Sequence, residues 1–299
     1  MYLIFKKRMF FYIISTKRAY MKQLINSALK TAVLIIKLVI PFYLLADILI
    51  YFGILQKISF IFEPITSIMG LNPEVSLSIA AGVLFNLYAA IAFAAPLGLT
   101  PYEWTILGLF LGIAHALPVE NTIMKKLSMP HWYSTVLRIG VGILAVLILR
   151  ALPIHIEGKT LQKEISLPHY SSFWDMTGTS LYNASILALK IIILITIIIF
   201  IMHFIKTKIF KNKNLSASFS VITGIILGIT YGAGILIAEK DKLTKKELLF
   251  VGTFLMIAHS LIEDPLLFVL FGANFWVLVG IRLILAVILS YIAVKFIKL

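Results

Sequence analysis

The chain contains a repeat of itself, and this repeat constrains its fold more than any other feature. Shifting the sequence by 144 residues places residues 99–117, LTPYEWTILGLFLGIAHAL, on residues 243–261, LTKKELLFVGTFLMIAHSL, without a gap. The register continues to a tryptophan (132 and 276) and an arginine (138 and 282). Apolar composition alone repeats Leu and Ile, but it does not repeat His, Glu, Trp and Arg in register. Duplicated membrane halves with a polar site between them are a common plan among transporters, so the repeat predicts that plan here.

Composition decides the class of protein. Apolar residues make up 61% of the chain, charged residues 13%, and the mean hydropathy is +1.01. Soluble domains average about 45–50% apolar and about 25% charged residues. Because several runs reach the roughly 20 apolar residues that cross a bilayer, we predict an all-α, polytopic integral membrane protein of about eight to ten transmembrane helices, embedded in the lipid bilayer.

The net charge of +14 does not indicate nucleic-acid binding, because the basic residues gather at ends and loops. One group precedes the first span (Lys6, Lys7, Arg8, Lys17, Arg18 and Lys22), and another follows residue 205. Such clusters mark the cytoplasmic side of a membrane, so we expect the N-terminus to be cytoplasmic. The chain has no cysteine, which excludes disulfides, iron–sulfur clusters and thiolate metal sites.

Polar segments divide the chain into four expected parts. Residues 1–24 form a basic amphipathic N-terminal segment, 25–152 the first membrane repeat, 153–178 a polar linker and 179–299 the second repeat. Spans are expected at about 31–54, 75–97, 101–128, 132–152, 180–205, 216–238, 246–271 and 276–297, and a short re-entrant or interfacial piece at 56–70.

The relative orientation of the two repeats depends on how the segments after the histidines cross. Four crossings in each half give parallel repeats. If segments 118–129 and 262–273 cross as separate half-helices, each half has five elements and the repeats are inverted, which is the arrangement we favour. The excess of Lys and Arg on the inner side is similar in both topologies, so it does not decide between them.

Each repeat carries a histidine followed by acidic residues near a proline. The segment AHALPVEN holds His115, Glu120 and Asn121, and AHSLIEDP holds His259, Glu263 and Asp264. A proline interrupts a helix, and a broken helix frees the backbone groups with which membrane proteins build ion and substrate sites. Charged groups at bilayer depth are costly and indicate function. We therefore expect the six residues to line one polar cavity near the bilayer midplane, with helix breaks after both histidines. The alternative is a purely structural polar cluster near the membrane surface.

The metal ligands that we predict within this set are His115, Glu120, His259 and Glu263, because imidazole and carboxylate both bind divalent transition metals. Glu263 follows His259 by four residues, so on a continuous helix the two side chains would share a face. Histidine also titrates near neutrality, which suits a coupling proton. No resident cofactor is expected, only a transported divalent metal ion or coupling proton.

Further repeated residues have structural interpretations. Thr100 with Glu103, and Thr244 with Glu247, match the T-x-x-E capping box at the start of a helix. Arg138 and Arg282 lie about six residues after an interfacial tryptophan, and they either extend to the membrane surface or pair with the acids.

Two polar positions outside the gapless repeat, Tyr88 and Asp47, give weaker indications of function. Tyr88 lies in a span rich in Ala and Gly, where small residues favour close helix packing. Asp47, near the end of the first span, could join a polar path.

Catalytic motifs are absent from the sequence. There is no H-E-x-x-H of a zinc protease and no G-x-S-x-G of a serine hydrolase. The linker segment Glu157-Gly158-Lys159-Thr160 ends like a phosphate-binding loop but has Pro153 where that motif requires its first glycine. We therefore expect the protein not to be an enzyme.

The two halves, each with a Gly-rich span followed by a helix carrying A-H-x-L and then acids, resemble the nucleoside-recognition or Gate domain family. Concentrative nucleoside transporters, the membrane part of ferrous-iron transport protein B and spore maturation proteins A and B share this family by distant similarity. The resemblance covers most of residues 25–299 and implies a multi-pass protein of the cytoplasmic membrane of a prokaryote. The chain lacks the GTPase domain of the iron transporter, and no nucleoside ligands can be carried over residue by residue.

Three functions follow from these observations. The preferred one is a transporter or permease that moves an ion, such as a divalent metal, or a small polar solute through a His/carboxylate site between the repeats. A nucleoside permease is the close alternative, with acids binding ribose hydroxyls. A non-transporting membrane assembly component, like the spore maturation proteins, belongs to another class. The expected partners are the bilayer and a small solute or ion, with no nucleic acid, and a homo-oligomer stays open.

Overall fold

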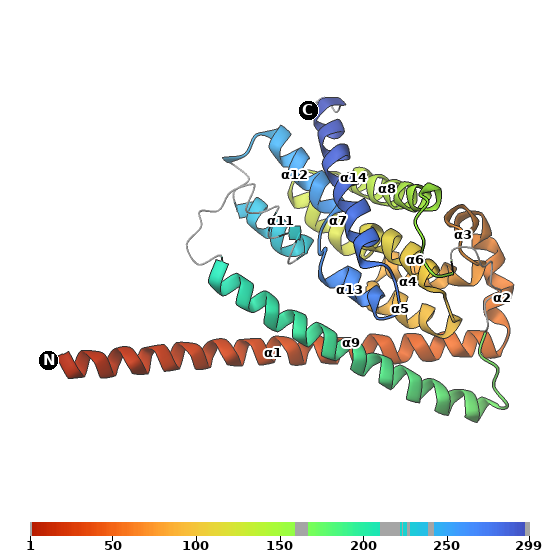
Figure 1. Ribbon diagram of the computed structural model, residues 1–299, viewed down its shortest axis with the longest axis horizontal. Helices are drawn as coiled ribbons and strands as arrows, with labels where there is room; N and C mark the ends of the chain where they lie inside the picture. The colour runs from red at the N-terminus through yellow and green to blue at the C-terminus, as the bar shows by residue number, and fades with distance from the viewer. Residues whose placement is uncertain are drawn as a thin grey trace.

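The computed structural model describes residues 2–158, 167–209, 222, 224–225, 228–238 and 242–296, and every regular element in them is helical (Figure 1). The first half contains α1 (Tyr2–Tyr51), α2 (Ile54–Ser59), η1 (Phe60–Phe62), α3 (Glu63–Met69), η2 (Pro73–Val75), α4 (Ser76–Leu84), α5 (Leu87–Ala94), η3 (Ala95–Leu97), α6 (Pro101–Ala114), α7 (Leu117–Lys126) and α8 (His131–Ala151). The second half contains α9 (Phe173–Ile209), α11 (Ile229–Ala238), α12 (Lys245–Ile257), α13 (Glu263–Val269) and α14 (Phe275–Phe296).

Five segments in the described residues are long and apolar enough to cross a membrane: Leu24–Tyr51, Pro101–Lys126, His131–Ala151, Phe173–Met202 and Phe275–Phe296. A sixth candidate is the pair Ile54–Met69 and Pro73–Leu84, which is bent by 101° and is either a broken span or a re-entrant loop. The chain is therefore an all-helical, multi-pass membrane protein.

The number of candidate spans is lower than the sequence predicts, for identifiable reasons. The expected span 75–97 is divided between α4 and α5, and α12 has only 13 residues. Part of the expected span 216–238 lies outside the described residues. The expected re-entrant piece 56–70 forms α2, η1 and α3 within the bent pair.

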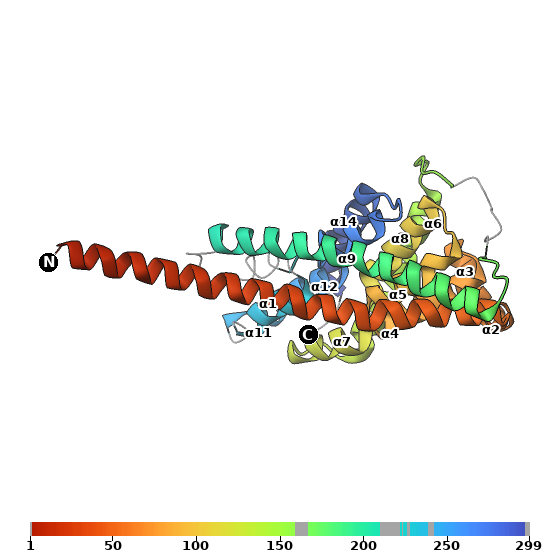
Figure 2. The same ribbon diagram turned by 90° about the horizontal axis from the view of Figure 1, so that it is seen from below.

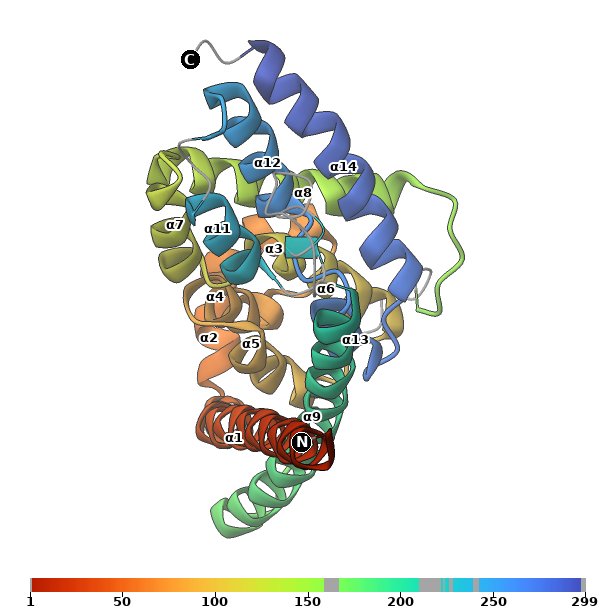
Figure 3. The same ribbon diagram turned by 90° about the vertical axis from the view of Figure 1, so that its left-hand side faces the viewer.

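Two long helices form one side of the molecule. Helix α1 has 50 residues and α9 has 37, and they lie side by side while running in opposite directions (Figures 1 and 2). The remaining helices gather on the other side of this pair (Figure 3). The predicted N-terminal segment 1–24 and the first span share α1, and α9 begins at Phe173, within the expected linker 153–178.

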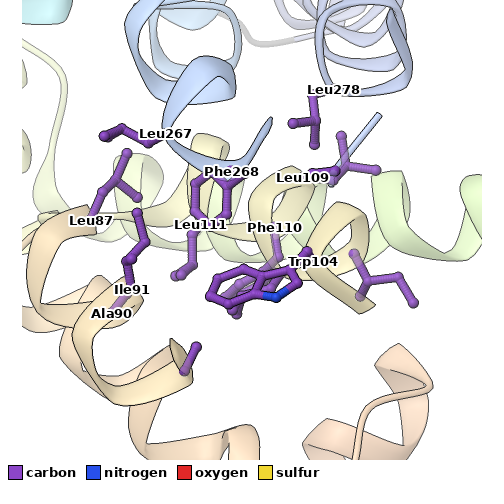
Figure 4. Packing of buried hydrophobic residues seen from close by; sticks show 14 of the residues in the cluster. Leu87, Ala90, Ile91, Trp104, Leu109, Phe110, Leu111, Leu267, Phe268 and Leu278 are labelled. Atoms are coloured by element: carbon purple, nitrogen blue, oxygen red, sulfur yellow. The ribbon is translucent and has the colours of Figure 1, made fainter. Parts of the chain in front are cut away.

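Helix α6 is the centre of the packed interior. Both α6 and α12 start with the predicted capping box, in which a threonine hydroxyl and a glutamate carboxylate satisfy each other's backbone N–H groups. Every α6 residue from Trp104 to Ala114 is buried. Figure 4 shows the side chains that surround it, including Leu87 and Ile91 of α5 and Leu267 and Phe268 of α13.

The predicted helix breaks are present in both halves. Helix α6 ends at Ala114 and α7 begins at Leu117, while α12 ends at Ile257 and α13 begins at Glu263. Proline stands at the second position of α7 and the third of α13. Its missing backbone N–H costs little there, because the N–H groups of a helix's first turn have no acceptor within the helix. A third break, between α4 and α5, has no proline. There Asn86 caps α5 by accepting a hydrogen bond from the N–H of Ala89 at 3.0 Å.

Close packing of α6 against α13 depends on a glycine. A Cβ atom at Gly108 would lie 2.7 Å from Cγ of the buried Phe268. We expect Gly108→Ala to destabilise the protein by about 1–3 kcal/mol, because overpacking forces neighbouring side chains to move. The control is Gly140→Ala on α8, where an added Cβ has nothing within 4 Å. That variant should keep or raise the thermal unfolding midpoint in detergent, and equal midpoints for the two variants would contradict the packing.

Candidate functional site

Both histidines stand at the helix breaks, and each is followed by a residue with a left-handed φ. His115 is the C-cap of α6, and the next residue, Ala116, has a left-handed φ of 48°. After His259, Ser260 has a φ of 50°. The N–H of Ala116 donates to the carbonyl of Gly82 at 2.9 Å, and the N–H of Ser260 donates to the carbonyl of Gly224 at 3.1 Å. Each break is therefore held against a glycine of the preceding segment in its own half.

The two imidazole rings are fixed by equivalent backbone hydrogen bonds. Nδ1 of His115 lies 2.8 Å from the carbonyl oxygen of Leu111, and Nδ1 of His259 lies 2.9 Å from that of Leu255. Because a carbonyl oxygen only accepts, Nδ1 carries the hydrogen in both rings. The ring centroids lie 5.2 Å apart, so the two Nε2 atoms are the groups left to interact with other partners.

Carboxylates from both half-helices approach the histidines. Glu120 of α7 places Oε1 3.4 Å from Nε2 of His115 and Oε2 3.6 Å from Nε2 of His259. Asp264 of α13 forms a group with both histidines in which the potential metal-ligand atoms lie within 4.8 Å of one another. Both acids lie in the first turn of a half-helix, where the helix dipole favours negative charge.

The arginines bind carbonyl and carboxylate groups at the helix breaks rather than extending to the membrane surface. Arg138 donates from Nε to the carbonyl of Ile113 at 2.6 Å and from Nη2 to the carbonyl of His115 at 2.9 Å. Its Nη2 also lies 2.5 Å from Oε2 of Glu120. Of the two interpretations of Arg138 that the sequence left open, pairing with an acid is therefore the one observed.

Arg282 repeats this pattern in the second half. It donates from Nε to the carbonyl of Ile257 at 3.2 Å and from Nη2 to that of His259 at 2.6 Å. Its Nη2 lies 3.9 Å from Oδ2 of Asp264. The same acceptors, spaced by the same 25 and 23 residues from the arginine, occur in both halves.

The other two predicted site residues lie around the cluster. Oε1 of Glu263 accepts a hydrogen bond from the hydroxyl of Tyr88 at 3.4 Å, so this acid faces α5 and is not part of the metal-ligand group. The side-chain amide of Asn121 hydrogen-bonds to two residues of α8 through both its nitrogen and its oxygen. It donates to Oγ1 of Thr135 at 2.7 Å and accepts from the hydroxyl of Ser134. Asn121 therefore ties α7 to α8.

Tyr88 is the site residue that the sequence interpretation missed. Its position in a span rich in Ala and Gly indicated helix packing, and its polar partner comes from 175 residues away in the chain. The one signal in the sequence was a tyrosine hydroxyl inside an otherwise apolar segment, since such a hydroxyl needs a partner when buried.

The cluster is enclosed. The exposed fraction is 8% for His115 and Glu120, 6% for Asp264, and 1% or less for His259 and both arginines. Two guanidinium groups pair with two of the carboxyl groups, Glu120 and Asp264, while the carboxyl group of Glu263 has a tyrosine hydroxyl as its partner.

The chain is similar to the uncharacterized membrane protein YvoD of Bacillus subtilis (strain 168). The identity is 26% over 275 residues, which covers 85% of this chain and 87% of the relative. No family model matches the chain, and no solved structure matches it. The similarity supports the assignment as a multi-pass membrane protein, and the resemblance to the Gate domain family stays a prediction.

The contacts of Arg138 predict a large stability effect. Arg138→Met would leave Glu120 buried without its guanidinium partner and two carbonyls without donors. We expect a loss of about 3–5 kcal/mol in the free energy of unfolding, which the double variant Arg138→Met with Glu120→Gln should partly restore. The control Arg150→Met removes an exposed guanidinium that also binds carbonyls, and should cost about 1 kcal/mol. Denaturant unfolding in detergent measures all three, and equal losses for the two single variants would contradict the role of Arg138.

Proposed function

We propose that the protein is a transporter, not an enzyme, that carries a divalent transition-metal ion through a site formed by His115, His259 and Asp264. This site lies where the broken helices of the two halves meet. The proposal includes that the halves are repeats of one ancestral unit, as their matching histidine and arginine hydrogen bonds support. It also places the protein in the cytoplasmic membrane of a prokaryote with a cytoplasmic N-terminus.

The observation that carries the proposal is the convergence of the two imidazoles and the Asp264 carboxylate, whose potential metal-ligand atoms lie within 4.8 Å of one another. Because both Nδ1 atoms donate to backbone carbonyls, the Nε2 atom of each neutral ring has a lone pair free to bind a cation. A metal-ligating histidine commonly donates its other N–H to a carbonyl in just this way. The donor set of two imidazoles and a carboxylate suits iron, manganese, zinc or nickel.

Transport requires that the enclosed cluster opens to each side of the membrane in turn. The half-helices α7 and α13 supply the acids, and transporters with broken helices alternate access largely by movement of one repeat against the other around such a site. We assign the enclosed arrangement to an occluded state. In this state Arg138 and Arg282 keep the acids in place.

A second function is favoured by one observation. The acid Glu120 already has a guanidinium partner at 2.5 Å, as expected of a cluster that only stabilises the fold. A non-transporting membrane assembly component would use the cluster in this way. The two functions differ in whether His115 and His259 bind a cation.

Loss of an imidazole tests the proposal. In proteoliposomes loaded with a metal-sensitive dye, we expect uptake of Mn²⁺ or Zn²⁺ by the wild-type protein. His115→Ala and His259→Ala should each reduce this uptake at least about tenfold, because metal sites lose 10–100-fold even when supporting groups are removed. The matched control is His131→Ala, since His131 is exposed at the start of α8 and should have no effect.

Binding of the metal is measured separately on the purified protein by calorimetry. Full uptake by both histidine variants would contradict the assigned site. A wild-type protein that neither binds nor takes up any of the four metals would favour the assembly component.

A further inference from the structure

A further buried acid lies outside the histidine cluster, between the two long helices α1 and α9. Asp47 of α1 is completely buried. Its Oδ2 accepts a hydrogen bond from the hydroxyl of Ser180 on α9 at 2.5 Å, and Tyr170, just before α9, is also hydrogen-bonded to it. Oδ1 makes no hydrogen bond to any described residue.

The surroundings of Asp47 contain no positive charge in the part of the chain that the structure describes. The titratable groups that face it are Tyr43 on its own helix and Tyr170 before α9, and the polar groups of α9 are Ser180 and Asn183. The amide of Asn183 is hydrogen-bonded to Tyr43. An ionised carboxylate that is buried without a cation is costly, whereas the protonated, neutral form avoids that cost.

A pocket of about 510 Å³ lies next to this acid. Its polar lining comes from Tyr43, His169, Tyr170, Asp175, Thr179 and Asn183, and Ala95 and Pro96 of η3 form part of its apolar wall. Tyr170 therefore both lines the pocket and bonds to Asp47. Burial and the hydrogen bond to Asp47 raise the pKa of Tyr170 above its usual range, so its hydroxyl stays protonated.

The donor set around Asp47 fits a proton better than a metal ion. One carboxylate and a few hydroxyl groups are too few for the six to eight oxygen ligands of Ca²⁺ or the octahedral shell of Mg²⁺. The free lone pairs of Oδ1 suffice for a proton. We propose that Asp47 is a proton-binding site that exchanges with the water-facing pocket through Tyr170.

The transfer is a simple relay. A hydronium ion in the pocket gives a proton to the hydroxyl oxygen of Tyr170 while that hydroxyl gives its own proton to the Asp47 carboxylate. One O–H bond forms for each that breaks, water is left in the pocket, and the phenol stays neutral throughout. Release runs in the opposite direction.

Helix α9 connects this site to the histidine cluster. It carries Ser180 near its start and also contacts α13, the half-helix that bears Asp264 (Figure 1). Protonation of Asp47 neutralises the carboxylate that accepts the hydrogen bond from Ser180. The hydrogen bond between α9 and α1 therefore changes with the protonation state of Asp47. In the transporter proposed above, on which this role alone rests, Asp47 would be the site of the coupling proton.

Infrared difference spectroscopy of the full-length protein in lipid tests the proton site without transport. Lowering the pH should produce a carboxylic-acid C=O band that is absent in Asp47→Asn and shifted in frequency in Tyr170→Phe. Glu157→Gln, which changes an exposed acid before α9, should keep the band unchanged. Identical difference spectra for the wild-type protein and Asp47→Asn in the carboxylic-acid C=O region would overturn the proposal. If Asp47→Asn fails to fold, an unshifted spectrum in Tyr170→Phe and in Ser180→Ala would overturn it.

Transport of Mn²⁺ in proteoliposomes tests the coupling role. Asp47→Asn should lose at least about tenfold in uptake driven by a pH gradient while keeping Mn²⁺ exchange between equal concentrations, because the metal site itself is intact. Undiminished gradient-driven uptake would refute the coupling. If the wild-type protein moves no metal while the infrared band of Asp47 is present, the proposed metal transport fails and the proton site stands.

Discussion

The interaction on which the rest of the site depends is the binding of backbone carbonyls by two buried guanidinium groups. A helix that ends inside an apolar interior leaves carbonyls without partners, and in a membrane no water satisfies them. Arg138 and Arg282 fill this need at the two breaks. A buried guanidinium then needs a negative partner, which Glu120 and Asp264 provide from the first turns of the half-helices. The acids are thereby brought to the histidines. The helix breaks therefore account for the cluster: the free carbonyls require the arginines, the arginines require the acids, and the acids lie beside the histidines.

Several of these elements could be predicted from sequence because their causes are local or repeated. The capping boxes need only a threonine and a glutamate three residues apart, and both formed. The helix breaks followed from the prolines and from the matching register of the histidines. The role of the arginines could not be decided, because two of the three acceptors of Arg138 are backbone carbonyls about 25 residues away, and carbonyls leave no signal in a sequence. The division of residues 75–97 into two short helices likewise has no proline to mark it.

Of the predicted metal ligands, only His115 and His259 belong to the group that the structure brings together. Glu120 is paired with Arg138 instead, and for Glu263 the reason is geometric. Glu263 was chosen because it follows His259 by four residues, a spacing that shares a face only on a continuous helix. Helix α12 ends at Ile257 and α13 begins at Glu263, so the intervening turn directs this acid toward Tyr88. Asp264, one residue later, lies with the histidines instead. Predicting a break therefore invalidates any helical spacing measured across it.

The two halves share their backbone hydrogen bonds but hold their acids differently, and this difference has a chemical consequence. Glu120 has the longer side chain and reaches Arg138 at 2.5 Å, whereas the shorter Asp264 stays 3.9 Å from Arg282. The first acid is thus committed to its arginine, and the second retains more of its charge for another partner. In the transporter proposed above, Glu120 would position the histidines while Asp264 exchanges partners with the cation. The difference of one methylene group between glutamate and aspartate at the matching positions would then separate these two tasks between the halves.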